Sequence, residues 1–496
     1  MRYFAALLLA LAAFPATAQN AEVTGGTVQG RTSQDGRAHI YEGIPFAASP
    51  TGDNRWRAPQ SVVPWTGVRS GAAPAPACLQ NDYQWNRANY LFGSEDCLTL
   101  DIRTPTNSSG KLPIMVWIHG GSNRAGSGSG GAYSQITDQG VVLVTVQYRL
   151  GIFGFLSHRK LAEEQNGNSG NYGLMDQIAA LKWVQSNIAN FGGDPSNVTI
   201  FGESAGSQNV SLLLAAPPAR GLFHKAIMQS GTPEFGMTYR PLTDAFKLGD
   251  QLDKIGDSNG DIAKLRRMSA HALLAADLEL NDERTWSKEF IWLRPTIDGA
   301  VLPKNPSALL AEAPVRPVII GTNRFEFGPA KGSIDIPAYT KYWFGENAAA
   351  ATKRYQSEEK TADPRLGHLE ARMETDAIFR CPANNLATQL SALGWPIWRY
   401  EFDIGPDDGS ESGGLTSHAY EISFIMDRKP AGSGARAVQM QDYWTNFAKS
   451  GVPGGAGKAK WSSFTRATKA YAMFDRKGIT PMSNLRAAAC ALVSAV

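Results

Sequence analysis

The sequence has little net charge and no block of basic residues. It contains 48 Lys and Arg against 45 Asp and Glu, spread along its 496 residues. Proteins that bind nucleic acids present a basic patch or stripe to the phosphates. The near balance of charge therefore argues against a nucleic-acid partner.

Cysteine is scarce, because the chain has only Cys78, Cys97, Cys381 and Cys490. It has no Cys-x-x-Cys pair and no His close to a Cys, so the spacing of metal-binding motifs is missing. We therefore expect no metal and no cofactor. In an oxidising compartment these cysteines allow three pairings. Joining Cys78 to Cys97 closes a short loop, and joining Cys381 to Cys490 ties the C-terminus to the body.

Long apolar runs are missing as well, since no stretch beyond the N-terminus approaches the roughly 20 residues that span a bilayer. At the N-terminus Arg2 precedes a short apolar run at 4–14, and the small residues 16–18 follow. This order is typical of a cleaved signal peptide. We predict a signal peptide at 1–18, export to the periplasm or the medium, and one domain at 19–496 without stable membrane insertion. Nothing in the sequence specifies the oligomeric state.

Buried strands and helices alternate along the chain, with no internal repeat. Apolar, β-branched runs predict strands, and helical spacing of apolar residues predicts helices between them. The expected strands are 23–29, 37–42, 112–118, 140–148, 198–201, 226–229, 317–321 and 397–402. The expected helices are 171–191 and 205–215, with a charged, mostly helical insertion at 339–393. This alternation predicts an α/β fold, a mostly parallel central sheet flanked by helices.

The motif Gly202-Glu203-Ser204-Ala205-Gly206 lies where the strand at 198–201 ends and the helix at 205–215 begins. A tight turn between strand and helix exposes the serine, and small neighbours let the two arms approach. This context distinguishes the motif from a chance occurrence in a chain with 50 glycines. Ser204 is the expected nucleophile.

The base that activates a serine is to be found among only seven histidines. In this class of fold the chain order is serine, acid, histidine. His224 and His271 follow Ser204 too closely, and His368 lies in a charged helical pattern that indicates a solvated face. His418, in a flexible loop before an apolar run, is the expected base.

The acid is expected on a loop after a strand between these two residues. Glu326 is the only carboxylate in the loop that follows 317–321. The alternative for Glu326 is a surface side chain paired with Arg324. We expect it to orient His418.

A loop rich in glycine, His119-Gly120-Gly121-Ser122, directly follows the core strand at 112–118. Backbone N–H groups from such a loop and from the residue after the nucleophile bind the oxyanion. We expect an oxyanion hole formed by Gly121, Ser122 and Ala205. His119 is expected to be structural.

With these residues in place, the chain resembles the type-B carboxylesterase and cholinesterase family, an α/β-hydrolase family, from about residue 23 to residue 490. The resemblance is carried by Tyr41-Glu-Gly-Ile-Pro-Phe-Ala47, Ser94-Glu-Asp-Cys-Leu-Thr-Leu-Asp101, Tyr148-Arg-Leu-Gly, Asn171-Tyr-Gly-Leu-Met-Asp-Gln177 and Phe191-Gly-Gly-Asp-Pro195.

This resemblance implies a serine carboxylic ester hydrolase of small-molecule esters that forms an acyl-enzyme through Ser204, Glu326 and His418. It implies the disulfides Cys78–Cys97 and Cys381–Cys490. It also implies that Ser230 supports Glu326, and that Glu203 and Glu421 are buried carboxylates near the histidine.

The chain departs from the family pattern at several positions. After His-Gly-Gly the family usually has Gly and an aromatic residue, whereas this chain has Ser122 and Asn123, followed by Arg124. The pocket for the alcohol is therefore expected to be more polar. Phe325 and Phe327 replace an Asp and a Gly around Glu326, so this loop is expected to pack differently.

Three alternatives remain open. A non-catalytic binding module on the same fold would have lost the nucleophile or the histidine, and this chain has both. Amide hydrolysis by the same residues is a second possibility. The third is an esterase for polar or anionic esters, in which a partly exposed Arg124 contacts a substrate carboxylate instead of pointing to solvent. On the acyl side, Trp286, Phe290 and Trp292 predict an apolar pocket.

Overall fold

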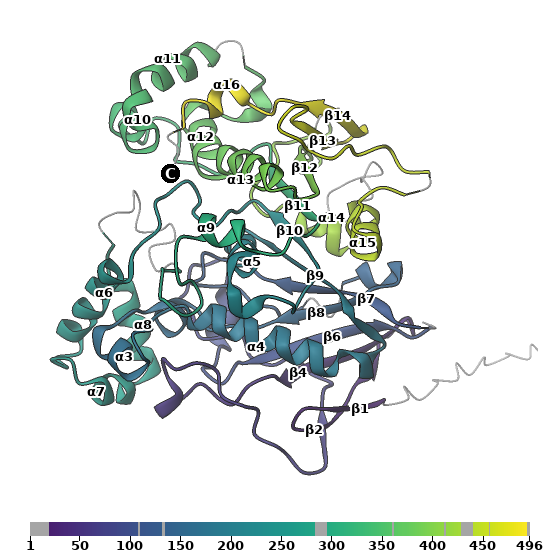
Figure 1. Ribbon diagram of the computed structural model, residues 1–496, viewed down its shortest axis with the longest axis vertical. Coiled ribbons are helices and arrows are strands. Elements are labelled where there is room, and N and C mark those ends of the chain that lie inside the picture. The colour runs from purple at the N-terminus through teal and green to yellow at the C-terminus, as the bar shows by residue number, and fades with distance from the viewer. Residues whose placement is uncertain are drawn as a thin grey trace, which may run out of the picture.

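The apolar runs of the sequence form one large sheet in the computed structural model of the protein (Figure 1). The structure describes residues 19–107, 110–130, 134–282, 295–359, 362–410, 413–427, 440–455 and 457–493. Eleven strands within these ranges make up the sheet, in the spatial order β14 (Gly478–Ser483), β13 (Ala470–Asp475), β12 (Ile397–Phe402), β11 (Val318–Asn323), β10 (Lys225–Gln229), β9 (Gly193–Glu203), β7 (Leu112–Ile118), β8 (Val142–Val146), β6 (Thr99–Pro105), β4 (Ala38–Pro45) and β3 (Arg31–Thr32).

The centre of this sheet is parallel, as predicted. All neighbours from β8 through β13 pair in parallel, whereas β3, β4, β6 and β14 add antiparallel pairs at the two ends. A separate small sheet contains β1 (Asn20–Val23), β2 (Gly26–Gln29) and β5 (Val68–Ser70). The carboxyl ends of the parallel strands meet at one edge, where ligands bind in open α/β sheets.

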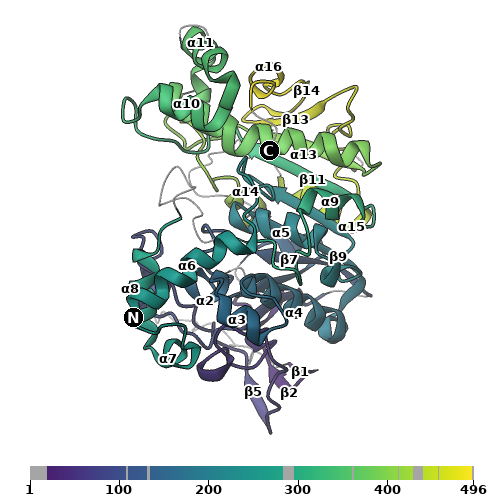
Figure 2. The same ribbon diagram turned by 60° about the vertical axis from the view of Figure 1, so that its left-hand side comes forward.

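Side chains alternate between the two faces of the sheet, and each face carries its own core. On β7, Ile114 and Val116 join one apolar cluster, and Met115 and Trp117 join another. The first cluster includes α4 (Tyr172–Asn187) and α5 (Ala205–Ala215), which Figure 2 shows in front of the strands. The second includes α14 (Ile422–Met426) and α15 (Met440–Ser450). Helices therefore cover both faces, as the alternating pattern predicted.

The other helices form groups around the sheet (Figures 1 and 2). They are α1 (Arg87–Leu91), α2 (Gly151–Phe155), α3 (Arg159–Glu164), α6 (Leu242–Ile255), α7 (Ile262–Arg267), α8 (Ala270–Glu279), α9 (Pro306–Ala311), α10 (Ile336–Phe344), α11 (Ala348–Glu358), α12 (Leu369–Glu374), α13 (Cys381–Ala392) and α16 (Ala487–Cys490). The expected insertion at 339–393 is α10 to α13, with a π-helical turn at Thr375–Arg380.

Several elements differ from the sequence-based expectation. The helix expected at 171–191 is α4 continued by a 3₁₀ turn, Ile188–Phe191. β9 begins at Gly193 although only 198–201 was expected, because its first half is polar. β6 was not expected, since Asp101 and Arg103 interrupt its apolar pattern; both are nevertheless buried.

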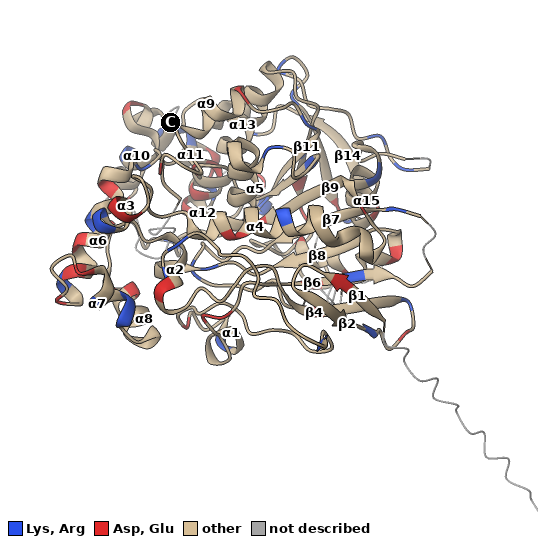
Figure 3. Cartoon of the chain, turned by 60° about the horizontal axis from the view of Figure 1, so that its bottom comes forward, with Lys and Arg blue, Asp and Glu red and all other residues tan. Residues whose placement is uncertain are grey.

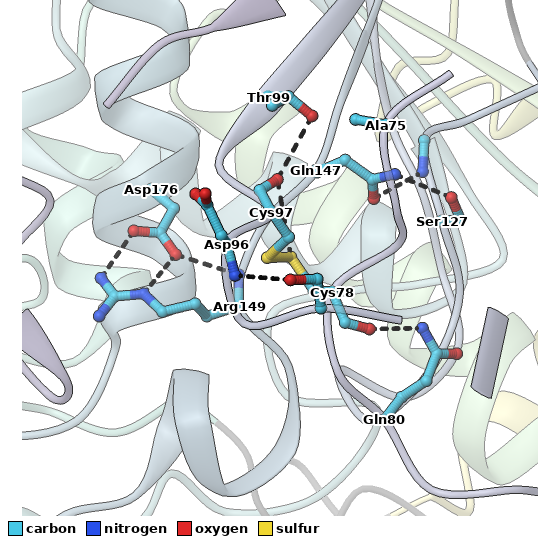
Figure 4. Close-up of a disulfide and its surroundings, with 12 residues drawn as sticks. Ala75, Cys78, Gln80, Asp96, Cys97, Thr99, Ser127, Gln147, Arg149 and Asp176 are labelled. Atoms are coloured by element: carbon cyan, nitrogen blue, oxygen red, sulfur yellow. Dashed lines mark hydrogen bonds and ion pairs between the residues drawn. A yellow bond between two sulfur atoms is a disulfide. The ribbon is translucent and has the colours of Figure 1, made fainter. Parts of the chain in front are cut away.

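Two disulfides join the pairs that the family resemblance implied, Cys78 with Cys97 and Cys381 with Cys490. The first lies beside the buried ion pair of Arg149 and Asp176, with Nη2 2.7 Å from Oδ1 (Figure 4). The second links the start of α13 to the end of α16. It closes a loop with a sequence separation of 109 residues, so it restricts the unfolded chain strongly.

Charges of both signs are interspersed on the helices α3, α6, α7 and α8 (Figure 3). None of the helices in the described ranges is long and apolar enough to cross a membrane. The predicted signal peptide at 1–18 lies outside the described residues.

Candidate active site

Ser204 lies in a sharp turn between β9 and α5, at the carboxyl edge of the sheet. Its backbone has φ 56° and ψ −126°, a region that non-glycine residues rarely adopt. The strand before it and the helix after it hold this conformation, and the Ser204 N–H donates to Gln229 O at 2.9 Å. Strain of this kind marks functional turns. No described group hydrogen-bonds to the Ser204 hydroxyl.

Glycines flank this turn because the end of β7 approaches it closely. A Cβ atom on Gly206 would lie 2.1 Å from Ile118 O, and one on Gly202 would lie 2.6 Å from the same oxygen. On the facing loop, a Cβ on Gly120 would lie 2.6 Å from Glu203 O. Any side chain at these positions would separate the loop after β7 from Ser204.

The loop after β7 presents backbone donors next to the turn. Gly121, Ser122 and Asn123 have φ of 102°, 57° and 56°. Within the described part of the chain, the N–H groups of Gly121 and Ser122 form no hydrogen bond. Ala205 opens α5, so its N–H is one of the donors that a helix leaves without an intrahelical partner.

His418 donates two hydrogen bonds to Glu326. The His418 Nδ1–H donates to Glu326 Oε2 at 2.8 Å, and the backbone N–H of His418 donates to Glu326 O at 2.9 Å. The carboxylate of Glu326 is buried, with 1% of the residue exposed. The Nδ1 hydrogen bond places the lone pair of the neutral ring on Nε2, on the side away from Glu326.

Glu326 is itself held by two more donors on its other oxygen. Ser230 Oγ and the Asn323 N–H both donate to Oε1 at 2.7 Å. The expected alternative, a surface pair with Arg324, is wrong. Arg324 pairs instead with Asp363, with its Nη2 2.7 Å from Asp363 Oδ2.

Two more buried carboxylates surround the histidine. Glu203 Oε1 lies 3.1 Å from His418 Nε2, without the alignment of a hydrogen bond. Glu421 accepts from Asn323 Nδ2 at 2.7 Å and from Gln229 Nε2 at 3.2 Å. Burial raises the pKa of both carboxyl groups.

The charge of His418 responds to these neighbours. Burial by itself lowers the pKa of His418, but Glu203 and Glu326 outweigh burial and raise the pKa above the ordinary value of histidine. The raised pKa means that the imidazolium is stabilised more than the neutral ring. The site is thus suited to hold a proton on this ring for part of a reaction.

Two aromatic rings pack against the histidine, and sequence reasoning missed one of them, Phe379. Phe327 contacts the His418 ring edge-on at 4.9 Å, so the residue that replaces the usual glycine packs against the site. Phe379, from the π-helical turn, lies 5.0 Å from the same ring. Thr375, at the start of that turn, accepts from the Glu326 N–H at 3.4 Å. No local sequence motif indicates a role for Phe379 or Thr375, because both come from a helical segment that is distant from Glu326 in the sequence.

Trp85 was also missed. A Cβ atom on Gly121 would lie 3.2 Å from Cη2 of this indole, and 66% of Trp85 is exposed. The signal in the sequence was a tryptophan between Cys78 and Cys97. It places a large aromatic surface next to the loop that follows β7.

Two of the other histidines, His119 and His368, take structural positions. His119 is buried, stacks on Tyr148 with ring centroids 4.4 Å apart, and donates from Nδ1 to Gly120 O. Burial lowers its pKa to about 4, as suits a structural residue. His368, expected on a solvated helix face, instead caps α12 by accepting from the Ala371 N–H.

Asn123 and Arg124 are both buried, contrary to the expectation of a partly exposed arginine. Asn123 Nδ2 donates to Gln208 at 3.2 Å, and its Oδ1 accepts from Asn209 at 2.8 Å. The Arg124 guanidinium lies 4.8 Å from the centre of the Tyr83 ring, with 8% of the residue exposed. It also lowers the pKa of Asp277, which burial raises to about 6. Arg124 is therefore not the partly exposed or solvated side chain that was expected.

The expected acyl-pocket residues Trp286, Phe290 and Trp292 lie outside the described residues.

The parallel sheet, the strained serine between β9 and α5, and the buried Glu326–His418 pair at the same edge define an α/β-hydrolase. Comparison with known proteins gives the family. The profile of the Carboxylesterase family matches residues 17–493. Solved structures of PNB esterase are similar, with one at TM-score 0.82 and 32% identity that covers 96% of this chain and 100% of that chain.

Named relatives agree with the profile. The chain is 35% identical to fumonisin B1 esterase of Sphingopyxis macrogoltabida, over 89% of this chain and 84% of the relative. It is 35% identical to para-nitrobenzyl esterase of Bacillus subtilis, over 91% of this chain and 93% of the relative. It is 33% identical to liver carboxylesterase 1 of Oryctolagus cuniculus, over 86% of this chain and 83% of the relative. The chain belongs to the carboxylesterase family and is a serine hydrolase of carboxylic esters.

The burial of Arg124 predicts a structural role. Arg124→Ala should lower the free energy of unfolding by about 2 kcal/mol, because it removes a desolvated cation–π contact and the charge beside Asp277. The ratio of kcat/KM for matched neutral and carboxylate-bearing esters should not change. Denaturant unfolding and paired kinetics measure both quantities.

Arg69→Ala is the matched control, because the exposed Arg69 guanidinium lies 5.7 Å from the Trp65 ring and should contribute little. An Arg124→Ala protein of full stability that has lost a preference for anionic esters would contradict this role.

Proposed function

We propose that Ser204 is the nucleophile of an acyl-enzyme mechanism. Its hydroxyl oxygen attacks the ester carbonyl, the alcohol leaves, and water then releases the acid from the serine ester. The observation that carries this proposal is the strained Ser204 turn at the sheet edge that also holds the Glu326–His418 pair.

His418 acts as the base in this proposal. Neutral Nε2 accepts the serine proton during attack and later returns it to the leaving alkoxide. The hydrogen bond from Nδ1 to Glu326 selects the tautomer with a free Nε2, and the buried carboxylate stabilises the imidazolium that forms. The contact of Nε2 with Glu203 is poorly aligned, which leaves Nε2 able to turn its lone pair to Ser204 once substrate is bound.

Gly121, Ser122 and Ala205 form the proposed oxyanion hole. Their N–H groups come from the loop after β7 and from the start of α5, which the glycines allow to lie in close contact. Little rearrangement is therefore needed when negative charge develops on the oxyanion. Removal of one such donor from an oxyanion hole costs about 3 to 4 kcal/mol in the transition state. Ser122 donates from its backbone, so its side chain does not alter this role.

Ser230, Glu203 and Glu421 support the triad in this proposal. Ser230 and the Asn323 N–H hold Glu326 in the orientation that His418 needs. Glu421 fixes the Asn323 side chain, and Glu203 adds negative charge beside the imidazolium.

The surroundings favour esters with apolar or aromatic groups. Phe327 and Phe379 lie against His418, and Trp85 lies against the oxyanion loop. A preference for anionic esters was expected to depend on a partly exposed Arg124, whereas its guanidinium is buried against the Tyr83 ring. A non-catalytic module on this fold is disfavoured, because the serine, the histidine and the acid are all retained.

We further propose that residues 1–18 are a signal peptide and that 19–496 is the mature domain, exported to the periplasm or the medium. The family profile begins at residue 17, which leaves the apolar segment at 4–14 outside it. Two disulfides suit an oxidising compartment.

Ser204→Ala tests the nucleophile. It should lower kcat on a p-nitrophenyl ester by about 10⁵- to 10⁶-fold with an unchanged unfolding transition, because the histidine then has no hydroxyl to activate. Ser211→Ala on the same helix removes only a hydrogen bond to Gln208 O and should retain full activity. Residual activity in Ser204→Ala within tenfold of wild type would exclude the assignment.

The pH profile tests the base. His418 must be neutral to accept a proton, and its pKa is raised. As the pH is lowered, kcat/KM should therefore begin to fall at a pH above about 6.5, the ordinary pKa of histidine. Glu203→Gln removes a nearby carboxylate, lowers the pKa of His418 and should move this acid limb to lower pH. A limb that stays in place, or moves to higher pH, would contradict the role of Glu203.

Export is tested at the N-terminus of the mature protein. The intact mass and N-terminal sequence of exported protein should show Gln19 as the first residue, because small residues at positions 16 and 18 form the cleavage site. Ala18→Arg should block processing, whereas Gln19→Glu should not. Exported protein that retains residues 1–18 would overturn this prediction.

A further inference from the structure

A cavity of about 270 Å³ lies beside α13, away from the triad. Its walls come from α13, β12, β13 and the segment that leads into α16, elements that lie together in both Figures 1 and 2. The lining residues used below are Asn385, Arg399, Lys469, Tyr471 and Asn484. None of the residues placed in the active site lines it.

Arg399 lines this cavity and carries a buried positive charge that has no acidic partner among the described residues. Only 1% of the residue is exposed. Its Nη1 and Nη2 donate to two neutral acceptors, Ile320 O and Asn384 Oδ1, both at 2.8 Å. Burial lowers the pKa of Arg399 to about 10, so the guanidinium is still charged at neutral pH.

The nearest acid on the same strand does not neutralise Arg399. Glu401 Oε1 accepts from Arg380 Nε at 3.0 Å, and Arg324 Nη1 lies 3.7 Å from Glu401 Oε2. Within the described residues no carboxylate lies at ion-pair distance from Arg399. A buried cation is strongly disfavoured unless a counter-charge compensates it.

A second cation stands at the mouth of the cavity. Lys469 is exposed and forms no ion pair with any described residue. Its backbone has φ 43°, and its carbonyl accepts from the Asn484 N–H, which fixes the direction of the segment. The lining residues that the structure describes include no Asp or Glu.

The other polar groups of the lining can donate hydrogen bonds. Tyr471 is buried, and its hydroxyl forms no hydrogen bond with the described part of the chain. Burial raises its pKa to about 12, so the hydroxyl keeps its proton. Asn385 and Asn484 add side-chain amides. Two cations and several donors thus converge on one hollow.

We propose that this cavity binds a small oxyanion, a phosphate or carboxylate group, between Arg399 and Lys469. The planar guanidinium matches the paired oxygens of such groups, and three of its five N–H donors remain after the bonds to Ile320 and Asn384. The cavity is slightly smaller than the roughly 300 to 1,000 Å³ of drug-sized sites, so the ligand is a small ion or metabolite. The Cys381–Cys490 disulfide, whose Cys490 lines the cavity, holds its walls together.

Calorimetric titration of the mature protein with inorganic phosphate and with succinate tests the site, at constant ionic strength maintained with sodium chloride. Wild type should bind at least one anion. Arg399→Gln should weaken binding about tenfold or more, because a charged hydrogen bond is lost. Lys469→Glu, an exposed change that leaves folding intact, should weaken it more than Lys469→Ala, for which about two- to fivefold is expected. Lys449→Ala, an exposed lysine on α15 outside the cavity, should bind as wild type does.

The anion that binds more tightly, phosphate or succinate, identifies the ligand as a phosphoryl or a carboxylate compound. The proposal is overturned if neither anion binds wild type, or if Lys469→Glu binds both as tightly as wild type does. The Lys469→Glu result decides the matter even where Arg399→Gln does not fold. Because no triad residue lines the cavity, failure here leaves the proposed ester hydrolysis untouched.

Discussion

Backbone contact between the end of β7 and the turn that carries Ser204 is the constraint on which the site depends. Gly202 and Gly206 both lie against Ile118 O, where a Cβ atom would come within 2.6 and 2.1 Å. This contact brings the loop with Gly121 and Ser122 next to the first N–H groups of α5. It also holds Ser204 in a strained conformation that the strand and helix on either side stabilise. In the proposed mechanism, the N–H donors and the serine hydroxyl are therefore positioned before any substrate arrives, which is what electrostatic catalysis requires.

The second constraint is electrostatic. Three carboxyl groups, from Glu203, Glu326 and Glu421, are buried around one imidazole. Burial of three negative charges costs much free energy. Hydrogen bonds donated by Ser230, Asn323 and Gln229 to Glu326 and Glu421 offset part of this cost. The excess of negative charge favours the imidazolium. The buried arginines show the opposite sign of charge: Arg380 is paired with Asp376 and Glu401, whereas Arg399 has no acidic partner among the described residues.

Much of this arrangement follows from local sequence, and the remainder does not. The place of Ser204 in a strand-to-helix turn was predictable because a strand, small residues and a helix surround it. The pairing of Glu326 with His418 was predictable because the loop of Glu326 has a single carboxylate. The strands 112–118 and 397–402 and the helix 205–215 end where the apolar pattern ends. The burial of Arg124 was not predictable, since Tyr83 and Asp277 reach it from distant segments. Phe379 depends on a π-helical turn, for which the sequence carries no local signal.

The most direct test of the proposed mechanism is a crystal structure of the protein after reaction with an alkyl phosphonate that mimics the tetrahedral intermediate. The mechanism predicts a covalent bond from Ser204 Oγ to phosphorus. It predicts the phosphonyl oxygen at about 2.7 to 3.1 Å from the N–H groups of Gly121, Ser122 and Ala205, and His418 Nε2 facing the leaving-group side. Phosphorus bonded to any other residue, or a phosphonyl oxygen directed away from these N–H groups, would contradict it.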